Sequence, residues 1–163
     1  MKKRVLSLLM AFVMVVGLLP ATTRAAEDND VVAVEVTVYD QGKLVKDKDG
    51  KAVFLRTVEV KDQNDNGITD IDDALYALHE ACYDGGAANG YSAANGNYGL
   101  SLFKLWGDSS KSFGYYVNDN AAWSLADQIH NGDHLTAFIY YDKTNWSDRY
   151  SFFNVKEKTV EVG

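Results

Sequence analysis

The chain has 163 residues, with 16 basic and 23 acidic side chains, so its formal net charge at pH 7 is −7. This acidic balance argues against nucleic acids and anionic membranes as partners, because both carry negative charge themselves. Cys82 is the single cysteine, which excludes a disulfide within the chain, and an aromatic content of 12% favours a packed, strand-rich domain over disorder.

The first 26 residues have the pattern of a secretory signal peptide. Lys2-Lys3-Arg4 precedes an almost unbroken apolar run that ends at Leu19 and is shorter than the roughly 20 residues of a membrane-spanning helix. Thr23-Arg24-Ala25 then offers small residues for cleavage. Cleavage removes four basic and no acidic residues, so the net charge falls from −7 to −11. We expect a bacterial protein, secreted or at the cell surface, without membrane insertion after cleavage. An uncleaved N-terminal anchor is the alternative.

Two strands joined as a hairpin are predicted after the signal. Val31 to Tyr39 alternates β-branched residues with Ala33, Glu35 and Thr37, and residues 52–61 again favour an extended chain. Clusters of Asp, Gly and Lys between the two segments mark turns.

The segment from Asp62 to Asp73 has the spacing of a calcium-binding loop. Oxygen-bearing side chains stand at positions 1, 3, 5, 9 and 12, and Gly67 stands at position 6, where such a loop turns sharply. Ca²⁺ takes about six to eight oxygen ligands, and one short segment supplies most of them here. The predicted ligands are Asp62, Asn64, Asn66, the backbone carbonyl of Ile68, Asp70 and Asp73.

This loop resembles the EF-hand loop. Its last ligand is Asp73 instead of the usual Glu, which is similar to the dockerin version, while Thr69 takes a position that is usually hydrophobic. The same Asp and Asn residues also suit a metal-free turn that caps a helix. We expect a structural calcium ion, which would stabilise an exported domain that has no disulfide, and the metal-free cap is the alternative.

One helix is predicted from Asp70 to Tyr83, ended by Asp84-Gly85-Gly86. Cys82 lies on its apolar side and is expected to be a buried, inert thiol. His79 is not part of a zinc motif, because the residue four positions later is Tyr83 and not a second His. The apolar residues recur at spacings of four, three and four and form one stripe: Ile71, Leu75, Leu78 and Cys82.

The rest of the chain is predicted to be mostly β. Residues 87–98 are rich in Gly, Ala and Asn and are expected to form a long ordered loop. Strands are expected at 100–106, 113–117 and 134–141, an irregular segment at 121–128, a loop at 142–148 and an edge strand at 149–153. Residues 156–163 are expected to form a further edge strand or to begin another module.

This order of elements predicts an α+β fold for a single domain, residues 27–155. A helix with one apolar stripe suits a position across one face of a mixed sheet of about five strands. That is a β-grasp-like arrangement.

The run Phe113-Gly114-Tyr115-Tyr116-Val117-Asn118, followed by Gly132-Asp133 and then Phe138-Ile139-Tyr140, resembles a known pattern. It is similar to the C-terminal domain of transcobalamin and intrinsic factor, and more closely to a related family of bacterial secreted and surface domains. The resemblance covers roughly residues 31–155 and implies a β-grasp-like fold. The chain departs from the family at Asp119, where Gly is usual, and the helical domain that helps transcobalamin enclose the corrin ring is missing.

The resemblance implies ligand-binding roles for Tyr115, Tyr116 and Asn118. The ordinary alternative is one Tyr in the core, its neighbour on the open face of the sheet, and Asn118 in a hairpin turn. Trp146 is a further candidate contact residue, because polar residues surround it in a loop.

No catalytic constellation is evident in the sequence. There is no G-x-S-x-G elbow, and His130 and His134 flank a predicted turn, where we expect both side chains to be solvated. We therefore expect a non-catalytic secreted or cell-surface binding or adhesion module, stabilised by calcium, whose ligand is a protein, a glycan or a small molecule. A small-ligand binder of the corrinoid or cobalamin type is the alternative.

Overall fold

The computed structural model describes residues 31–97, 99–110, 112–152 and 159–161. The expected signal peptide and most of the expected strand at 156–163 lie outside these residues. The main sheet has the strand order β2-β1-β8-β6-β7, and β3 also pairs with β1. The structure combines a strand-rich sheet with a few helices, which confirms the predicted α+β class. No helix in the described part of the chain is long and apolar enough to cross a bilayer.

Strand β1 (Val31–Asp40) organises the sheet because it pairs with three others. Its first six residues pair antiparallel with β3 (Arg56–Lys61), which confirms the predicted hairpin, and its last two pair with β2 (Lys43–Leu44). The prediction that the second strand starts at residue 52 is wrong. Leu55 has φ 48° and interrupts the extended chain, and Ala52 makes only an isolated bridge.

On its other side, β1 pairs in parallel with β8 (His134–Ile139), from Glu35 opposite His134 to Asp40 opposite Ile139. Strand β8 in turn pairs antiparallel with β6 (Phe113–Val117), and β7 (Asn120–Ala121) closes that edge. The centre of the sheet is therefore made by segments about a hundred residues apart in the chain.

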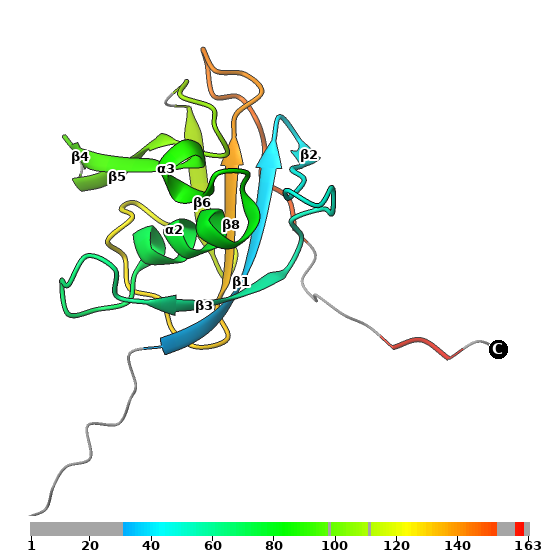
Figure 1. Cartoon of the computed structure of the whole chain (residues 1–163). Helices are drawn as coiled ribbons and strands as arrows, with labels where there is room; N and C mark the ends of the chain where they lie inside the picture. The colour runs from blue at the N-terminus through cyan, green and yellow to red at the C-terminus, as the bar shows by residue number, and fades with distance from the viewer. Residues whose placement is uncertain (1–30, 98, 111, 153–158, 162–163) are drawn as a thin grey trace, which may run out of the picture.

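Helix α2 (Ile71–Cys82) packs on one face of this sheet, to the left in Figure 1. All four residues of the predicted stripe are at most 1% exposed, and Val34, Val36 and Val60 are buried with them in one core. The first four backbone N–H groups of a helix lack partners within it. Here Asp127 O, Leu125 O, the Asp70 side chain and Asp70 O accept them in turn.

The prediction of a long loop at residues 87–98 is wrong. A short helix, α3 (Gly86–Gly90), follows α2, and β4 (Ser92–Gly96) pairs with β5 (Gly99–Lys104) as a separate two-stranded ribbon. This ribbon lies on the same side of the main sheet as α2 (Figure 1), where Leu102 is buried in the core. The predicted third strand therefore exists but is not part of the main sheet.

Within the described residues, no helix covers the opposite face of the sheet. Residues 148–152, which we term the strap, run along this face on the right of Figure 1. The edge strand predicted at 149–153 is absent from residues 149–152, which have no strand pairing. Instead, the ring of Tyr150 stacks on that of Tyr116 in β6, with centroids 3.9 Å apart and an interplanar angle of 10°.

Candidate functional site

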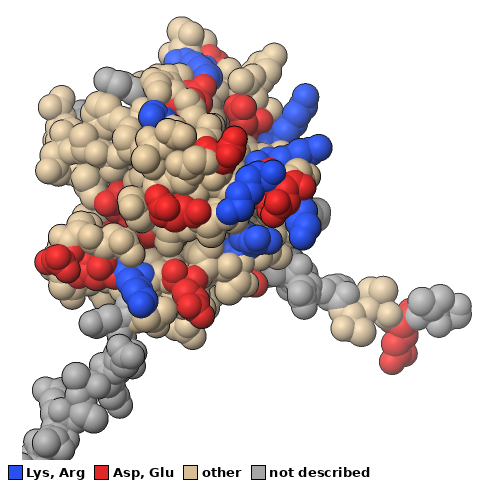
Figure 2. Space-filling view, in the orientation of Figure 1, with Lys and Arg blue, Asp and Glu red and all other residues tan. Residues whose placement is uncertain are grey.

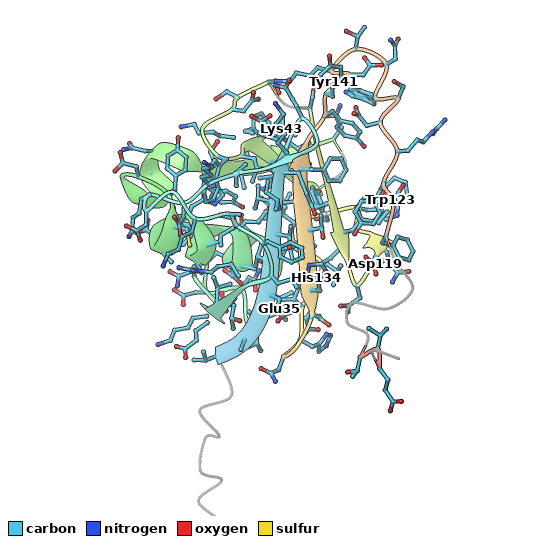
Figure 3. All side chains as sticks on the ribbon, turned by 90° about the vertical axis from the view of Figure 1, so that its right-hand side faces the viewer. Glu35, Lys43, Asp119, Trp123, His134 and Tyr141 are labelled. Atoms are coloured by element: carbon cyan, nitrogen blue, oxygen red, sulfur yellow. The ribbon has the colours of Figure 1, made fainter. Side chains whose placement is uncertain are left out.

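A groove of about 520 Å³ lies on the open face of the sheet, between the strap and the segment that leads into β3. Residues of β1, β8 and β6 form its floor, among them Thr37, Thr136 and Tyr116. Figure 3 looks on to this face, with His134 on β8 in the middle and Asp119 at the side where the strap runs. Seven aromatic residues line the groove: Tyr39, Phe54, Tyr116, Phe138, Tyr140, Tyr150 and Phe152.

A polar network holds one wall of the groove to its floor. Thr37 is 1% exposed. Its hydroxyl accepts a hydrogen bond from the Leu55 backbone N–H at 3.0 Å and lies 3.2 Å from His134 Nε2. A positive φ is uncommon for a residue such as Leu55, and non-glycine outliers of this kind concentrate at functional sites. The neighbouring Phe54 is left 55% exposed at the rim.

The prediction that His134 is solvated is wrong, since its side chain is half-buried in the groove, whereas His130 is exposed.

The strap is fixed to the sheet by Tyr150. Its ring stacks on that of Tyr116, and its hydroxyl donates a hydrogen bond to the carboxylate of Asp119 at 2.9 Å. Burial and the nearby Asp119 charge raise the pKa of Tyr150 to about 12, so the phenol keeps its proton and remains a donor at neutral pH. The strap is therefore a structured wall of the groove.

Of the three positions that the resemblance implied, the groove includes only Tyr116. Tyr115 points to the other face of the sheet, packs against the core and donates to the Trp123 carbonyl at 3.4 Å. Asn118 lies in the turn after β6 with φ 49°. Trp146 is 60% exposed in the loop before the strap and does not line the groove.

Sequence reasoning missed most residues of the groove. Phe54 lay inside a predicted strand, and Phe152 lay inside a predicted edge strand. The available signal was the density of aromatic residues in 138–152. Phe138, Tyr140 and Tyr150 are separated by even numbers of residues, and side chains so spaced point to the same face wherever the chain is extended.

The predicted calcium loop joins β3 to α2 and turns its oxygens inward. Asp62 accepts hydrogen bonds from the backbone N–H groups of Asn66 at 3.2 Å and Gly67 at 2.7 Å. Asn64 Oδ1 accepts from Asn66 N–H at 3.1 Å, and Asn66 Oδ1 accepts from Ile68 N–H at 2.9 Å. Figure 2 shows Asp and Glu side chains gathered at the lower left, where this loop lies in Figure 1.

The end of the loop is also the start of α2. Asp70 is the N-cap, and it forms a capping box with Asp73, whose carboxylate accepts from the backbone N–H groups of Asp70 at 3.0 Å and Gln63 at 2.9 Å. Burial, together with the charges of Asp70 and Asp62, raises the pKa of the Asp73 carboxyl to about 6. Negative charge is therefore concentrated at this end of the loop.

The loop supplies oxygen donors of the kind that a hard cation prefers. In the described part of the chain, no three His, Cys, Asp or Glu side chains form a group that could hold a metal ion on their own. Oxygens of Asn64, Asn66 and the Ile68 backbone would have to complete the ligand set. The Asn66 Nδ2 group donates to Asp70 at 2.9 Å, so an ion bound between these two side chains would replace that hydrogen bond.

His79 is a buried polar residue outside both features. Its Nε2 accepts from the Trp106 backbone N–H at 3.1 Å, which leaves the proton on Nδ1, 2.6 Å from the Leu75 carbonyl. Burial lowers the pKa of His79 to about 4, so the ring is neutral at physiological pH. With both nitrogens engaged inside the core, this residue has a structural role.

No protein-family model matches the chain, and no curated protein shows significant similarity to it. Function is therefore inferred from the geometry of the chain itself.

Proposed function

We propose that this chain is a non-catalytic binding module of an exported bacterial protein, secreted or held at the cell surface, and that its ligand occupies the groove on the open sheet face. One observation carries the proposal. A sheet with one face packed on a helix leaves its other face exposed, and here that face bears a hollow lined by seven aromatic side chains. Concave sites of roughly 300–1,000 Å³ with aromatic walls and a few polar groups are typical of ligand-binding pockets.

The export part of the proposal rests on the sequence of residues 1–26. Its test is to express the full chain in a bacterial host and measure the intact mass of the protein that leaves the cytoplasm. Loss of residues 1–25 is the expected result. A protein retained in the cell at its full mass would contradict export.

We further propose a β-grasp-like fold. The supporting features are the β1–β3 hairpin, helix α2 that follows it, and strand β8 lying parallel to β1 in the middle of the sheet. This arrangement agrees with the fold that the resemblance to the transcobalamin-related domains implies.

A structural calcium ion in the loop 62–73 completes the proposal. Asp62, Asn64, Asn66, Asp70, Asp73 and the Ile68 carbonyl would hold it, and a bound Ca²⁺ would neutralise the carboxylates that gather there. Because the loop starts at the end of β3 and ends in the first turn of α2, the ion would fix the helix to the hairpin.

The calcium proposal is tested by thermal melts of Asp62→Asn and Asp65→Asn, with calcium and with a chelator. The two variants make the same change of charge in the same loop. Asp65 is at the non-ligand position 4, and with φ 55° it tolerates Asn. Calcium should raise the midpoint of the unmodified protein and of Asp65→Asn, and should not raise that of Asp62→Asn. Equal midpoints with calcium and with chelator in the unmodified protein would leave the helix cap as the explanation of the loop.

The groove is tested independently of any ligand class by mapping a library of small fragments on the protein with amide NMR spectra. True ligand sites bind fragments of several chemistries because they are concave and partly apolar. Shifts should gather at Phe54, Thr136 and Phe152. Shifts that gather instead around the exposed Trp123 or Trp146 would show that the groove is not the binding site.

A corrinoid is the second candidate ligand, and the observation that favours it is the position of Tyr116 in the groove. Titration with cyanocobalamin, followed by its visible absorption, decides this candidate. A saturable spectral change that is lost in Tyr116→Ala would support it.

A further inference from the structure

Resting on the binding function proposed above, we propose that the groove takes a short, neutral oligosaccharide. The lining of the groove combines two chemistries that carbohydrates require together. Of the sixteen described residues that line it, seven carry a hydroxyl group and seven carry an aromatic ring, with four tyrosines in both sets. A sugar presents hydroxyls that both donate and accept hydrogen bonds, and C–H faces that pack on the electron-rich faces of aromatic rings.

The rings available to a ligand come from the two walls. Tyr116 and Tyr150 cover each other's faces by stacking, so neither offers both faces to a ligand. Phe54 and Phe152 are 55% and 56% exposed; Phe54 belongs to the segment before β3, and Phe152 to the strap after β8. Exposed phenylalanines at the rim of a hollow are costly in water, and a sugar ring packed on either one would shield it.

The charges of the groove favour a neutral ligand. Among the described residues that line it, the only Asp, Glu, Lys or Arg residues are Asp148 and Arg149, which have opposite signs and are adjacent in the chain. These residues therefore form no basic cluster for a phosphate or an acidic sugar. The acidic balance of the chain adds to this, because it repels anions at long range.

The backbone of the floor disfavours an extended peptide. Strand β8 is paired on both sides, with β1 and β6, and β1 also has partners on both sides. Peptides that add to a sheet need an edge with unpaired N–H and C=O groups, whereas β1 and β8 are paired on both sides. A ligand in the groove must therefore be recognised by side chains, among them hydroxyls, aromatic rings and the imidazole of His134.

The test is a calorimetric and NMR titration of the protein with cellotetraose, mannotetraose and N-acetylchitotetraose, each compared with an alanine-rich tetrapeptide and with cyanocobalamin. At least one sugar should bind and shift the signals of groove residues. Phe54→Ala and Phe152→Ala should each weaken its binding by about tenfold, because each removes one packing face. Trp123→Ala and Tyr141→Ala are the matched controls: both rings are more exposed, at 84% and 72%, and neither lines the groove.

The outcomes separate this inference from the function on which it rests. Sugar binding that Phe54→Ala weakens and Tyr141→Ala leaves unchanged supports both. Binding of the peptide or of cyanocobalamin in the groove, without any sugar, overturns the carbohydrate inference and leaves the binding function in place. If fragments and all these probes fail to shift groove signals, the binding function itself is wrong. Sugar binding that only Trp123→Ala abolishes overturns the position of the site.

Discussion

The side-chain amide of Asn118 donates to the carboxylate of Asp133 at 2.7 Å and so joins the turn after β6 to the turn before β8. The amide oxygen of Asn118 accepts from the His134 backbone N–H at 2.9 Å, and Asp133 accepts from that of His130 at 2.7 Å. Two pieces of the sequence pattern that suggested a family resemblance therefore meet in space. Their contact explains them as residues that build paired turns.

The first prediction concerns the stability that Asn118 provides. Asn118→Gly keeps the positive φ but removes the side-chain bonds, and it should lower the free energy of unfolding by about 2 kcal/mol. Asn118→Ala should cost about 1 kcal/mol more, because Ala tolerates φ 49° poorly. Urea denaturation measures both, with Asn95→Gly in the exposed part of β4 as the control. A variant Asn118→Gly as stable as the parent would mean that the turns hold without this contact.

A second prediction separates the two roles of the loop before α2. Asp73→Ala removes the acceptor for two backbone N–H groups, so it should lower the free energy of unfolding by about 2 kcal/mol with chelator. The loss should be larger with calcium, because the same carboxylate is a proposed ligand of the ion. Asp62→Asn should matter mainly with calcium. Chemical denaturation of both variants in both conditions gives the answer. If Asp73→Ala loses stability only in calcium, the capping box contributes little.

The third prediction is a pH dependence that comes from His79. Its pKa is lowered from 6.5 to about 4 in the folded protein, so the native state favours the neutral ring. The stability that results is complete above pH 6.5 and decreases as the pH falls from 6.5 to 4. The loss over this interval is about 3 kcal/mol. Protonation of Nε2 also removes the acceptor of the Trp106 N–H.

His79→Gln provides the comparison for this titration. Glutamine does not titrate, so the free energy of unfolding of this variant should change less between pH 6.5 and pH 4 than that of the parent. Denaturant unfolding at a series of pH values measures the two slopes. Parallel slopes would show that carboxyl groups, and not His79, control acid stability in this range.

The fourth prediction concerns Cys82, which is 1% exposed on the buried stripe of α2. Burial raises the pKa of its thiol, so little thiolate is present at neutral pH. A thiol reagent such as iodoacetamide should modify the native protein very slowly and the urea-unfolded protein quickly, as followed by intact mass. Fast modification of the native chain would mean that the end of α2 opens readily.

The elements with a strong local signal could be predicted from sequence. The alternation of Val34, Val36 and Val38 indicated β1, and the spacing of the apolar stripe indicated α2, because each pattern follows directly from the period of its element. The loop between β3 and α2 could also be predicted, because closely spaced Asp and Asn residues favour turns over regular strands or helices.

The groove could not be predicted in the same way. Its floor depends on the pairing of β1 with β8, and no local pattern records which distant strand lies beside β1. Its walls depend on two departures from regular structure, the positive φ of Leu55 and the stacking of Tyr150 on Tyr116. Both segments have strand-like composition, so local propensity pointed to strands and tertiary contacts decided otherwise.

The parallel pairing of β1 with β8 also has a consequence for the order of folding. Glu35 and His134 are neighbours in the sheet, so the sheet cannot close until nearly all of the domain has been synthesised. Contacts between such distant segments form slowly because a long loop must first be closed. If the chain is exported as proposed above, slow closure of the sheet would suit translocation, which requires an unfolded polypeptide. The β1–β3 hairpin and α2 come from one local stretch of the chain, so β8 would complete the sheet only after transfer across the membrane.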